Sequence, residues 1–236
     1  MKHITQTVKE FFNFTLITLT IVLCPLASAQ ESSKIAQTQG PARFKPLTME
    51  ELNVYQQPLG QQVMKVSSIG LGGPYSPLLR SPVMGQRMFD LLYYLRWNSS
   101  VPLRLNEFAI LIIGRQWRSQ VEWFAHAPLA IKAGLSPEIV ATLKTQKRPE
   151  KMAEDEAMVY DFVTELTQNK SISDATFTKA RKIFSEQQIV DLTTITGTYV
   201  TVAMLLAMAD ESVPAGRELP FKPGEPQTEA TNVADM

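Results

Sequence analysis

The chain has 236 residues, which is the length of about one to one-and-a-half domains. Basic and acidic residues number 23 each, so the net charge is zero, which argues against a nucleic-acid-binding protein with its usual basic excess. Apolar residues make up 44% of the chain, enough for a packed core, and one cysteine and two histidines exclude a disulfide framework, a zinc finger and an iron–sulfur cluster.

Residues 1–29 have the features of a secretory signal peptide. A weakly positive start is followed by an apolar run over 14–26 and by the small-x-small pattern that ends at Ala29, where signal peptidase would cleave. This run is short for a membrane span of about 20 residues, so an uncleaved anchor is a less favoured alternative. A lipidated Cys24 is also less favoured, because the preceding Leu23 is bulky where a small residue is expected. Cleavage would leave a periplasmic or secreted chain with one histidine and no cysteine, and with no stable membrane span.

Composition divides the remaining chain into three parts. Residues 30–47 are polar and predict a flexible linker. Residues 48–213 predict one folded domain, without a visible internal repeat. Residues 214–236 contain four prolines and predict an extended tail, in which Leu219 and Phe221 are the side chains able to pack.

Helical signals dominate the predicted domain, which begins with a capping box at Thr48. Apolar periodicity, cap residues and the stop signal at Gly134 predict helices over 84–97, 104–117, 119–133, 137–145, 151–168, 173–184 and 186–209. The β-branched segment 193–202 has high strand propensity, but its apolar continuation favours a buried helix. No other segment sustains a period of two, so the predicted fold class is all-α.

One segment combines side chains able to transfer protons. Ser119, Glu122 and His126 are spaced i, i+3 and i+7, which places them on one face of a helix. Glu122 and His126 are i, i+4 neighbours, so the carboxylate could orient the imidazole and raise its pKa. Such a pair in an apolar surrounding, supplied here by Trp123 and Phe124, can give or take a proton near neutral pH.

The same residues have structural explanations. Ser119 and Glu122 match a capping box, which by itself would account for both of them at the start of a helix. A single histidine on an apolar helix, such as His126, is commonly a core residue whose hydrogen bonds are satisfied. One histidine and one glutamate lack the third ligand that zinc takes, so no metal site is predicted.

Two further segments have simpler interpretations. The acidic residues Glu150, Glu154, Asp155 and Glu156 suit the solvated first turn of a helix, where the helix dipole favours negative charge. The glycine-rich segment 70–74 lacks the lysine and the flanking elements of a phosphate-binding loop, and it is interpreted as a mobile loop.

The chain resembles the carboxymuconolactone decarboxylase family of the alkylhydroperoxidase D-like superfamily. The resemblance centres on Glu-Trp-x-x-His, the residues from Glu122 to His126, and extends over most of 48–213. The matching segments are 73–75, 79–82, 94–96, 106–111, 120–130, 133–136, 156–162 and 173–177. The resemblance implies a single all-α domain that forms homo-oligomers, either trimers or hexamers, and it places the loop at 70–74 near the site entrance as a candidate lid.

The peroxidase branch of this superfamily carries a Glu, then a Cys-x-x-Cys pair, then a His. In the same register this chain has Glu107, Ser119, Glu122 and His126, so both thiols are absent. Thiol peroxidase chemistry needs a thiolate to attack the peroxide and a second thiol to resolve the product. A peroxiredoxin-like activity is therefore a disfavoured alternative.

The decarboxylase branch implies removal of carbon dioxide from a small lactone acid without a metal or organic cofactor. The resemblance assigns His126 as proton donor, Glu122 as the group that orients it, and Glu107 as a second acid–base group. Substrate binding is assigned to Arg115, Arg118, Trp123 and Ser119, with the arginines as carboxylate ligands, although arginines more often form surface or structural ion pairs.

The expected function is an exported acid–base enzyme, a decarboxylase or a related lyase or isomerase, acting on a small carboxylic acid or lactone. The export signal departs from the intracellular role that the resemblance implies, so the substrate is expected to differ. A non-catalytic periplasmic binding oligomer is the other alternative.

Overall fold

The computed structural model describes residues 42–222, which form α-helices and one short 3-10 helix and contain no strand. The predicted signal peptide, most of the linker and the end of the tail lie outside the described residues. The elements are a 3-10 helix at Met49–Glu51 and helices α1 (Gln57–Val66), α2 (Tyr75–Arg80), α3 (Pro82–Trp97), α4 (Leu103–Gln116), α5 (Gln120–Lys132), α6 (Pro137–Lys144), α7 (Glu154–Asn169), α8 (Asp174–Ile183) and α9 (Glu186–Ala209). The all-α prediction is confirmed.

Each predicted helix is present, and the ambiguous segment 193–202 is helical as part of α9. The Ser185 hydroxyl accepts a hydrogen bond from the Gln188 N–H, and the Gln188 side chain accepts one from the Ser185 N–H, so α9 begins with a capping box. Two helices were not predicted: α1, whose ten residues include Pro58 and Gly60, and α2, whose six residues are too few to show a helical period.

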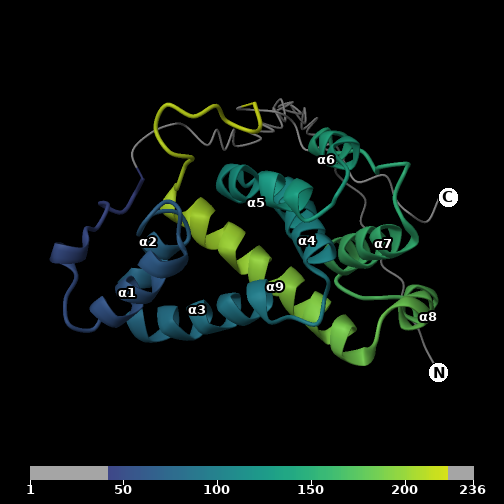
Figure 1. Ribbon diagram of the computed structural model, residues 1–236, viewed down its shortest axis with the longest axis horizontal. Helices are drawn as coiled ribbons and strands as arrows, with labels where there is room; N and C mark the ends of the chain where they lie inside the picture. The colour runs from purple at the N-terminus through teal and green to yellow at the C-terminus, as the bar shows by residue number, and fades with distance from the viewer. Residues whose placement is uncertain (1–41, 223–236) are drawn as a thin grey trace, which may run out of the picture. The chain divides into compact units, whose positions relative to one another are not determined.

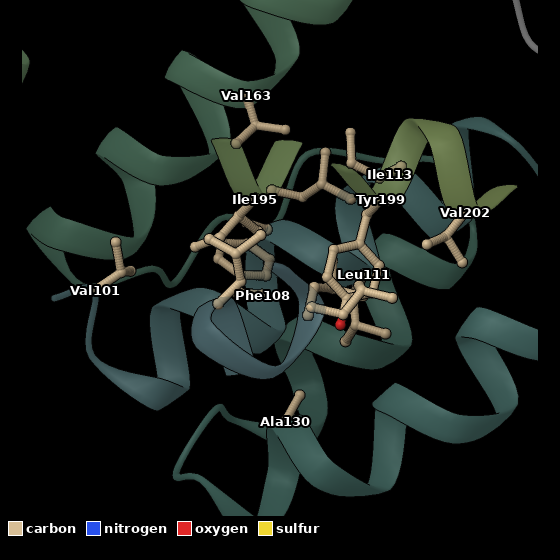
Figure 2. Close-up of a cluster of buried hydrophobic side chains, with 14 of the residues drawn as sticks. Val101, Phe108, Leu111, Ile113, Ala130, Val163, Ile195, Tyr199 and Val202 are labelled. Atoms are coloured by element: carbon tan, nitrogen blue, oxygen red, sulfur yellow. The ribbon is translucent and has the colours of Figure 1, made fainter. Parts of the chain in front are cut away.

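Helix α4 forms the centre of the core (Figure 1), where it packs against α5, α7 and α9. Its side chains from Leu105 to Arg115 are all buried. Figure 2 shows Phe108 and Leu111 of this helix against Ile195 and Tyr199 of α9. A charged side chain on α4 therefore projects into protein rather than into water.

Among residues 42–222, α9 is long and apolar enough to cross a membrane, with a mean hydropathy of 1.6 over its most apolar window. Half of that window is buried inside the protein, and the helix runs diagonally across the other helices in Figure 1. An apolar helix that is partly buried against other helices in this way is typical of the core of a folded domain.

A buried carboxylate attaches α9 to the turn between α3 and α4. Asp191 Oδ2 accepts hydrogen bonds from the Ser100 N–H at 2.8 Å and the Ser100 hydroxyl at 2.7 Å, and the Tyr94 hydroxyl lies 3.2 Å away. Burial alone would favour the neutral acid, but these hydrogen bonds outweigh it and lower the pKa of Asp191. The turn that precedes α4 is therefore fixed by a charged hydrogen-bond acceptor.

Packed structure extends past both ends of the predicted 48–213 domain. The Arg43 N–H donates to the Ala209 carbonyl at 2.8 Å, which satisfies a free carbonyl at the end of α9. At the other end Phe221 is only 2% exposed. The polar segments that flank the helices thus contribute to the folded unit.

The acidic cluster is not purely a solvated helix end, contrary to the sequence interpretation. Asp155 accepts a hydrogen bond from Arg104 at 2.6 Å, and Glu156, which is buried, also pairs with Arg104. The Glu156 side chain in addition accepts the Ala153 N–H at 2.7 Å. These contacts connect the first turn of α7 to the first turn of α4, a non-local role that the local charge pattern does not reveal.

Two glycines in helices should respond oppositely to substitution by alanine. A Cβ at Gly85 would lie 2.3 Å from the Leu78 carbonyl oxygen, because α2 and α3 approach closely, whereas a Cβ at Gly197 meets nothing within 4 Å. We expect Gly85→Ala to lower the free energy of unfolding by about 2–3 kcal/mol and Gly197→Ala to raise it by about 0.5–1 kcal/mol. Urea denaturation of both variants tests this; equal effects would contradict the packing of α2 on α3.

Candidate functional site

A tight turn joins α4 to α5 and sets the angle between them. The Ser119 N–H donates to the Gly114 carbonyl at 2.8 Å, and the Arg118 N–H donates to the Arg115 carbonyl at 3.1 Å, which is the hydrogen-bond pattern of a Schellman motif. Arg118 takes the left-handed conformation at this turn, with φ of 53°. The backbone of Arg118 therefore has a structural role in this turn. The sequence had predicted only a carboxylate-binding role for its side chain.

The central contact of the site joins these two helices. His126 Nδ1 of α5 donates a hydrogen bond to Glu107 Oε2 of α4 at 2.6 Å, and the residues are only 7% and 3% exposed. With Nδ1 assigned as the donor, Nε2 is left as the nitrogen that can accept a proton. The predicted pairing of Glu122 with His126 is wrong, because Glu107 orients the imidazole instead.

Glu122 occupies a buried position with little to compensate the loss of water. It is 3% exposed, and neither of its carboxyl oxygens has a hydrogen-bond partner among the residues that the structure describes. Burial raises the pKa of Glu122 to about 8, an effect that the nearby Ser119 hydroxyl opposes only in part. The carboxyl group is therefore mostly neutral at pH 7 and can donate a proton.

The capping-box explanation of Ser119 and Glu122 is not supported. Ser119 does occupy the N-cap position of α5, but its side chain accepts no capping hydrogen bond, and its hydroxyl is buried without a partner in the described part of the chain. Two buried polar side chains one turn apart at the start of a helix thus lack the local role that would explain them, which is typical of functional sites.

Tyr199 of α9 completes the surroundings of the histidine. Its ring packs edge-on against the His126 ring, with centroids 5.3 Å apart and planes at 90°. Burial raises the pKa of the Tyr199 phenol far above its usual range, and the acidic groups of Glu107 and Glu122 raise it further, against the opposing effect of Arg96. Tyr199 therefore remains an uncharged phenol beside the pair.

Aromatic and polar side chains cover the outer side of α5. Trp123 is buried and contacts the Phe221 ring at a centroid distance of 5.2 Å. The Arg115 guanidinium lies 4.5 Å from the centre of the same ring. Of the predicted substrate-binding residues, Arg115, Trp123 and Ser119 are thus buried near the turn, whereas Arg118 is only half-buried.

The site is closed in this conformation. Two surface hollows of the described chain lie elsewhere, one beside Arg148 and one between Gln62 and Tyr93, and neither is lined by Glu107, Glu122 or His126. The loop predicted to be a lid packs against the start of α5, since a Cβ at Gly73 would lie 3.6 Å from Val121 Cγ1. Glu107, Glu122 and His126 are themselves 3–7% exposed, so a substrate can reach them only after a neighbouring segment moves.

The chemistry available to this arrangement is proton transfer. Among residues 42–222 no group of three or more His, Cys, Asp or Glu side chains could hold a metal ion. The site combines an imidazole with a defined hydrogen-bond partner and a neutral carboxylic acid one helical turn away. Exclusion of water strengthens the electrostatic effect of both groups on a bound substrate.

The sequence identified Glu107, Glu122 and His126 and named Phe221 only as a packing residue of the tail, and it missed Tyr199 and Gln120. Tyr199 had no distinguishing signal, because it is one large residue in a long apolar helix. Gln120 bonds through its side chain to the backbone of Phe221, a contact over 101 positions that only the folded chain reveals. For Phe221 the signal was its isolation as a large apolar residue within a proline-rich polar tail.

Replacement of the buried acid should change how stability depends on pH. A pKa raised from 4.5 to about 8 means that the folded state keeps a proton that the unfolded state loses, so the free energy of unfolding decreases as pH rises through this interval. We expect Glu122→Gln to be more stable than the wild type by about 2–4 kcal/mol at pH 8 and equally stable near pH 4.5. Thermal unfolding measured across this range, with the exposed Glu138→Gln as control, tests the prediction; parallel curves would contradict it.

Comparison with known proteins identifies the fold. No family model matches the chain, and no curated protein matches it. Among solved structures it is similar to the crystal structure, at 2.15 Å resolution, of an alkylhydroperoxidase AhpD core, an uncharacterized peroxidase-related protein from Ralstonia eutropha JMP134. The TM-score is 0.62 at 11% identity, over 75% of this chain and 95% of that chain. This protein therefore has the alkylhydroperoxidase D-like helical fold.

Proposed function

We propose that the protein is a cofactor-independent acid–base enzyme acting on a small carboxylic acid or lactone. The observation that carries this proposal is the buried hydrogen bond between Glu107 and His126 beside the neutral acid Glu122. An imidazole with a free ring nitrogen beside a carboxylic acid that keeps its proton can supply both proton abstraction and proton donation. The resemblance to carboxymuconolactone decarboxylases adds the substrate class.

The proposed reaction assigns one role to each group. Glu107 holds the Nδ1–H of His126, so Nε2 is the base that removes a proton next to a carbonyl group. Glu122, rather than His126 as the resemblance implied, is the acid that protonates the carbanion or enolate. In a decarboxylation, the bond to the carboxylate breaks, carbon dioxide leaves, the electron pair passes to the adjacent carbon, and this carbon takes the proton of Glu122, which is then restored from water.

Peroxide reduction by a thiol pair is not supported. The structural neighbour is described as a peroxidase-related protein, but this chain has a single cysteine, Cys24, in the predicted signal peptide. The positions that correspond to the superfamily's thiols are Ser119 and Glu122, and neither side chain can form the sulfenic acid and disulfide of that cycle.

A non-catalytic binding oligomer is the second candidate, and the closed state of the site favours it. Glu107, Glu122 and His126 have almost no exposed surface, as expected if they only stabilise the core. We further propose that the protein is exported through residues 1–29 and assembles from identical subunits.

Substitution of the acid or of the base should strongly slow proton transfer. We expect Glu122→Gln and His126→Ala each to lower the rate on small lactones and lactone acids by about 10²–10⁴-fold. Deuterium incorporation next to the carbonyl in heavy water, followed by proton NMR, detects the step even where no net product forms. Glu138→Gln, an exposed substitution of the same kind, should retain the full rate.

The wild-type rate should also decrease above about pH 8, where Glu122 loses its proton. Undiminished exchange in the His126→Ala variant would exclude the role of the base. Absence of exchange in the wild type across a broad substrate panel would favour the non-catalytic alternative.

A further inference from the structure

The segment 214–222 follows α9 without forming a helix, and one of its side chains is fully buried. Residues 214–218 and Lys222 are exposed, and Leu219 and Pro220 are half-buried. Phe221 is an exception with 2% exposure. The segment is therefore anchored to the helices through a single aromatic side chain.

The contacts of Phe221 resemble those of a bound ligand. The Gln120 side-chain Nε2 donates to the Phe221 carbonyl at 2.9 Å, and the Phe221 N–H donates to Gln120 Oε1 at 2.9 Å. The Phe221 ring lies between the edge of Trp123, at a centroid distance of 5.2 Å, and the Arg115 guanidinium, 4.5 Å from the ring centre. One amide side chain thus recognises a carbonyl, while an indole and a cation recognise a flat ring.

The walls of this pocket belong to the helices that carry the acid–base groups. Arg115 is on α4, which also carries Glu107. Gln120 and Trp123 are on α5, on either side of Glu122 in the sequence. The walls thus come from two helices that pack together in the core, whereas Phe221 comes from the segment that follows α9.

We propose that the pocket filled by Phe221 is a substrate subsite, and that it accepts a planar ring with an adjacent carbonyl group. This inference rests on the proposed function and gives the substrate class: a flat unsaturated lactone or an aromatic acid or amide. Phe221 occupies the subsite when substrate is absent, so the C-terminal segment competes with substrate and closes the site.

The segment is held weakly enough to exchange. Besides the contacts of Phe221, the Arg217 guanidinium lies over the Phe124 ring at 5.4 Å, and the Arg217 N–H donates a turn hydrogen bond to the Pro214 carbonyl. An exposed segment with few buried contacts opens locally at a small fraction of the global free energy of unfolding. A substrate ring that reproduces the contacts of Phe221 compensates for their loss.

The first test removes the Phe221 side chain from the subsite and adds a small ligand that can take its place. In the full chain, Phe221→Ala should bind phenylacetamide, a ring with an adjacent amide, at least tenfold more tightly than the wild type does. Fluorescence is a suitable readout because Trp123 contacts the ring position, while Trp97 and Trp117 are partly exposed. Phe177→Ala, which removes an exposed phenylalanine from α8, should behave like the wild type.

The hydrogen bonds of Gln120 provide a specificity control. Adding Gln120→Leu to Phe221→Ala should weaken phenylacetamide binding at least fivefold and leave the affinity for toluene, a ring without an amide, unchanged. Equal binding by the Phe221→Ala and Phe177→Ala variants would overturn the proposal, and so would an equal loss of both ligands on adding Gln120→Leu.

A measurement on the unaltered protein covers the case in which Phe221→Ala does not fold. The Phe221 amide proton is hydrogen-bonded to Gln120, so phenylacetamide that displaces the segment should accelerate its exchange with heavy water, while amides in the middle of α4 remain protected. Unchanged exchange at saturating ligand would contradict the subsite. Both tests measure ligand binding and not catalysis. If the ligand binds at this subsite but the protein transfers no proton, only the proposed function is contradicted.

Discussion

The hydrogen bond between His126 and Glu107 is the contact on which the rest of the site depends. Both residues are almost fully buried, and an isolated charge in such a position would cost about several kcal/mol. Pairing across the α4–α5 interface reduces this cost and fixes the orientation of the imidazole. Since Glu107 is used in this way, Glu122 is left without a partner, and its carboxyl group responds to burial by keeping its proton.

The fold explains why these groups can be buried together. Helix α4 is surrounded by α5, α7 and α9, so a carboxylate on it must find a partner inside the protein. The Schellman turn at Arg118 brings the start of α5 back along α4, and α9 places Tyr199 against the histidine. On the outer side Trp123 and Phe221 pack against each other, and the acid–base groups are almost fully buried.

The sequence was most informative where structure is determined locally. Cap residues and apolar periods located the longer helices, because these signals act within a few residues, and the same reasoning could not detect the short α1 and α2. Glu107, Glu122 and His126 were identified together, but the i, i+4 spacing suggested the wrong pair. The partner of His126 is 19 positions away, and only the crossing of α4 and α5 brings it into contact.

The protonation state of Glu122 is the central claim, and it can be measured directly. Carbon-13 NMR of protein labelled at glutamate side-chain carboxyl carbons, with Glu122 assigned by comparison with Glu122→Gln, gives its titration curve. A midpoint near pH 8 is the expected result, because burial without a hydrogen-bond partner disfavours the charged form. A midpoint near the ordinary value of 4.5 would show that Glu122 is ionised at neutral pH and would contradict its role as the proton donor.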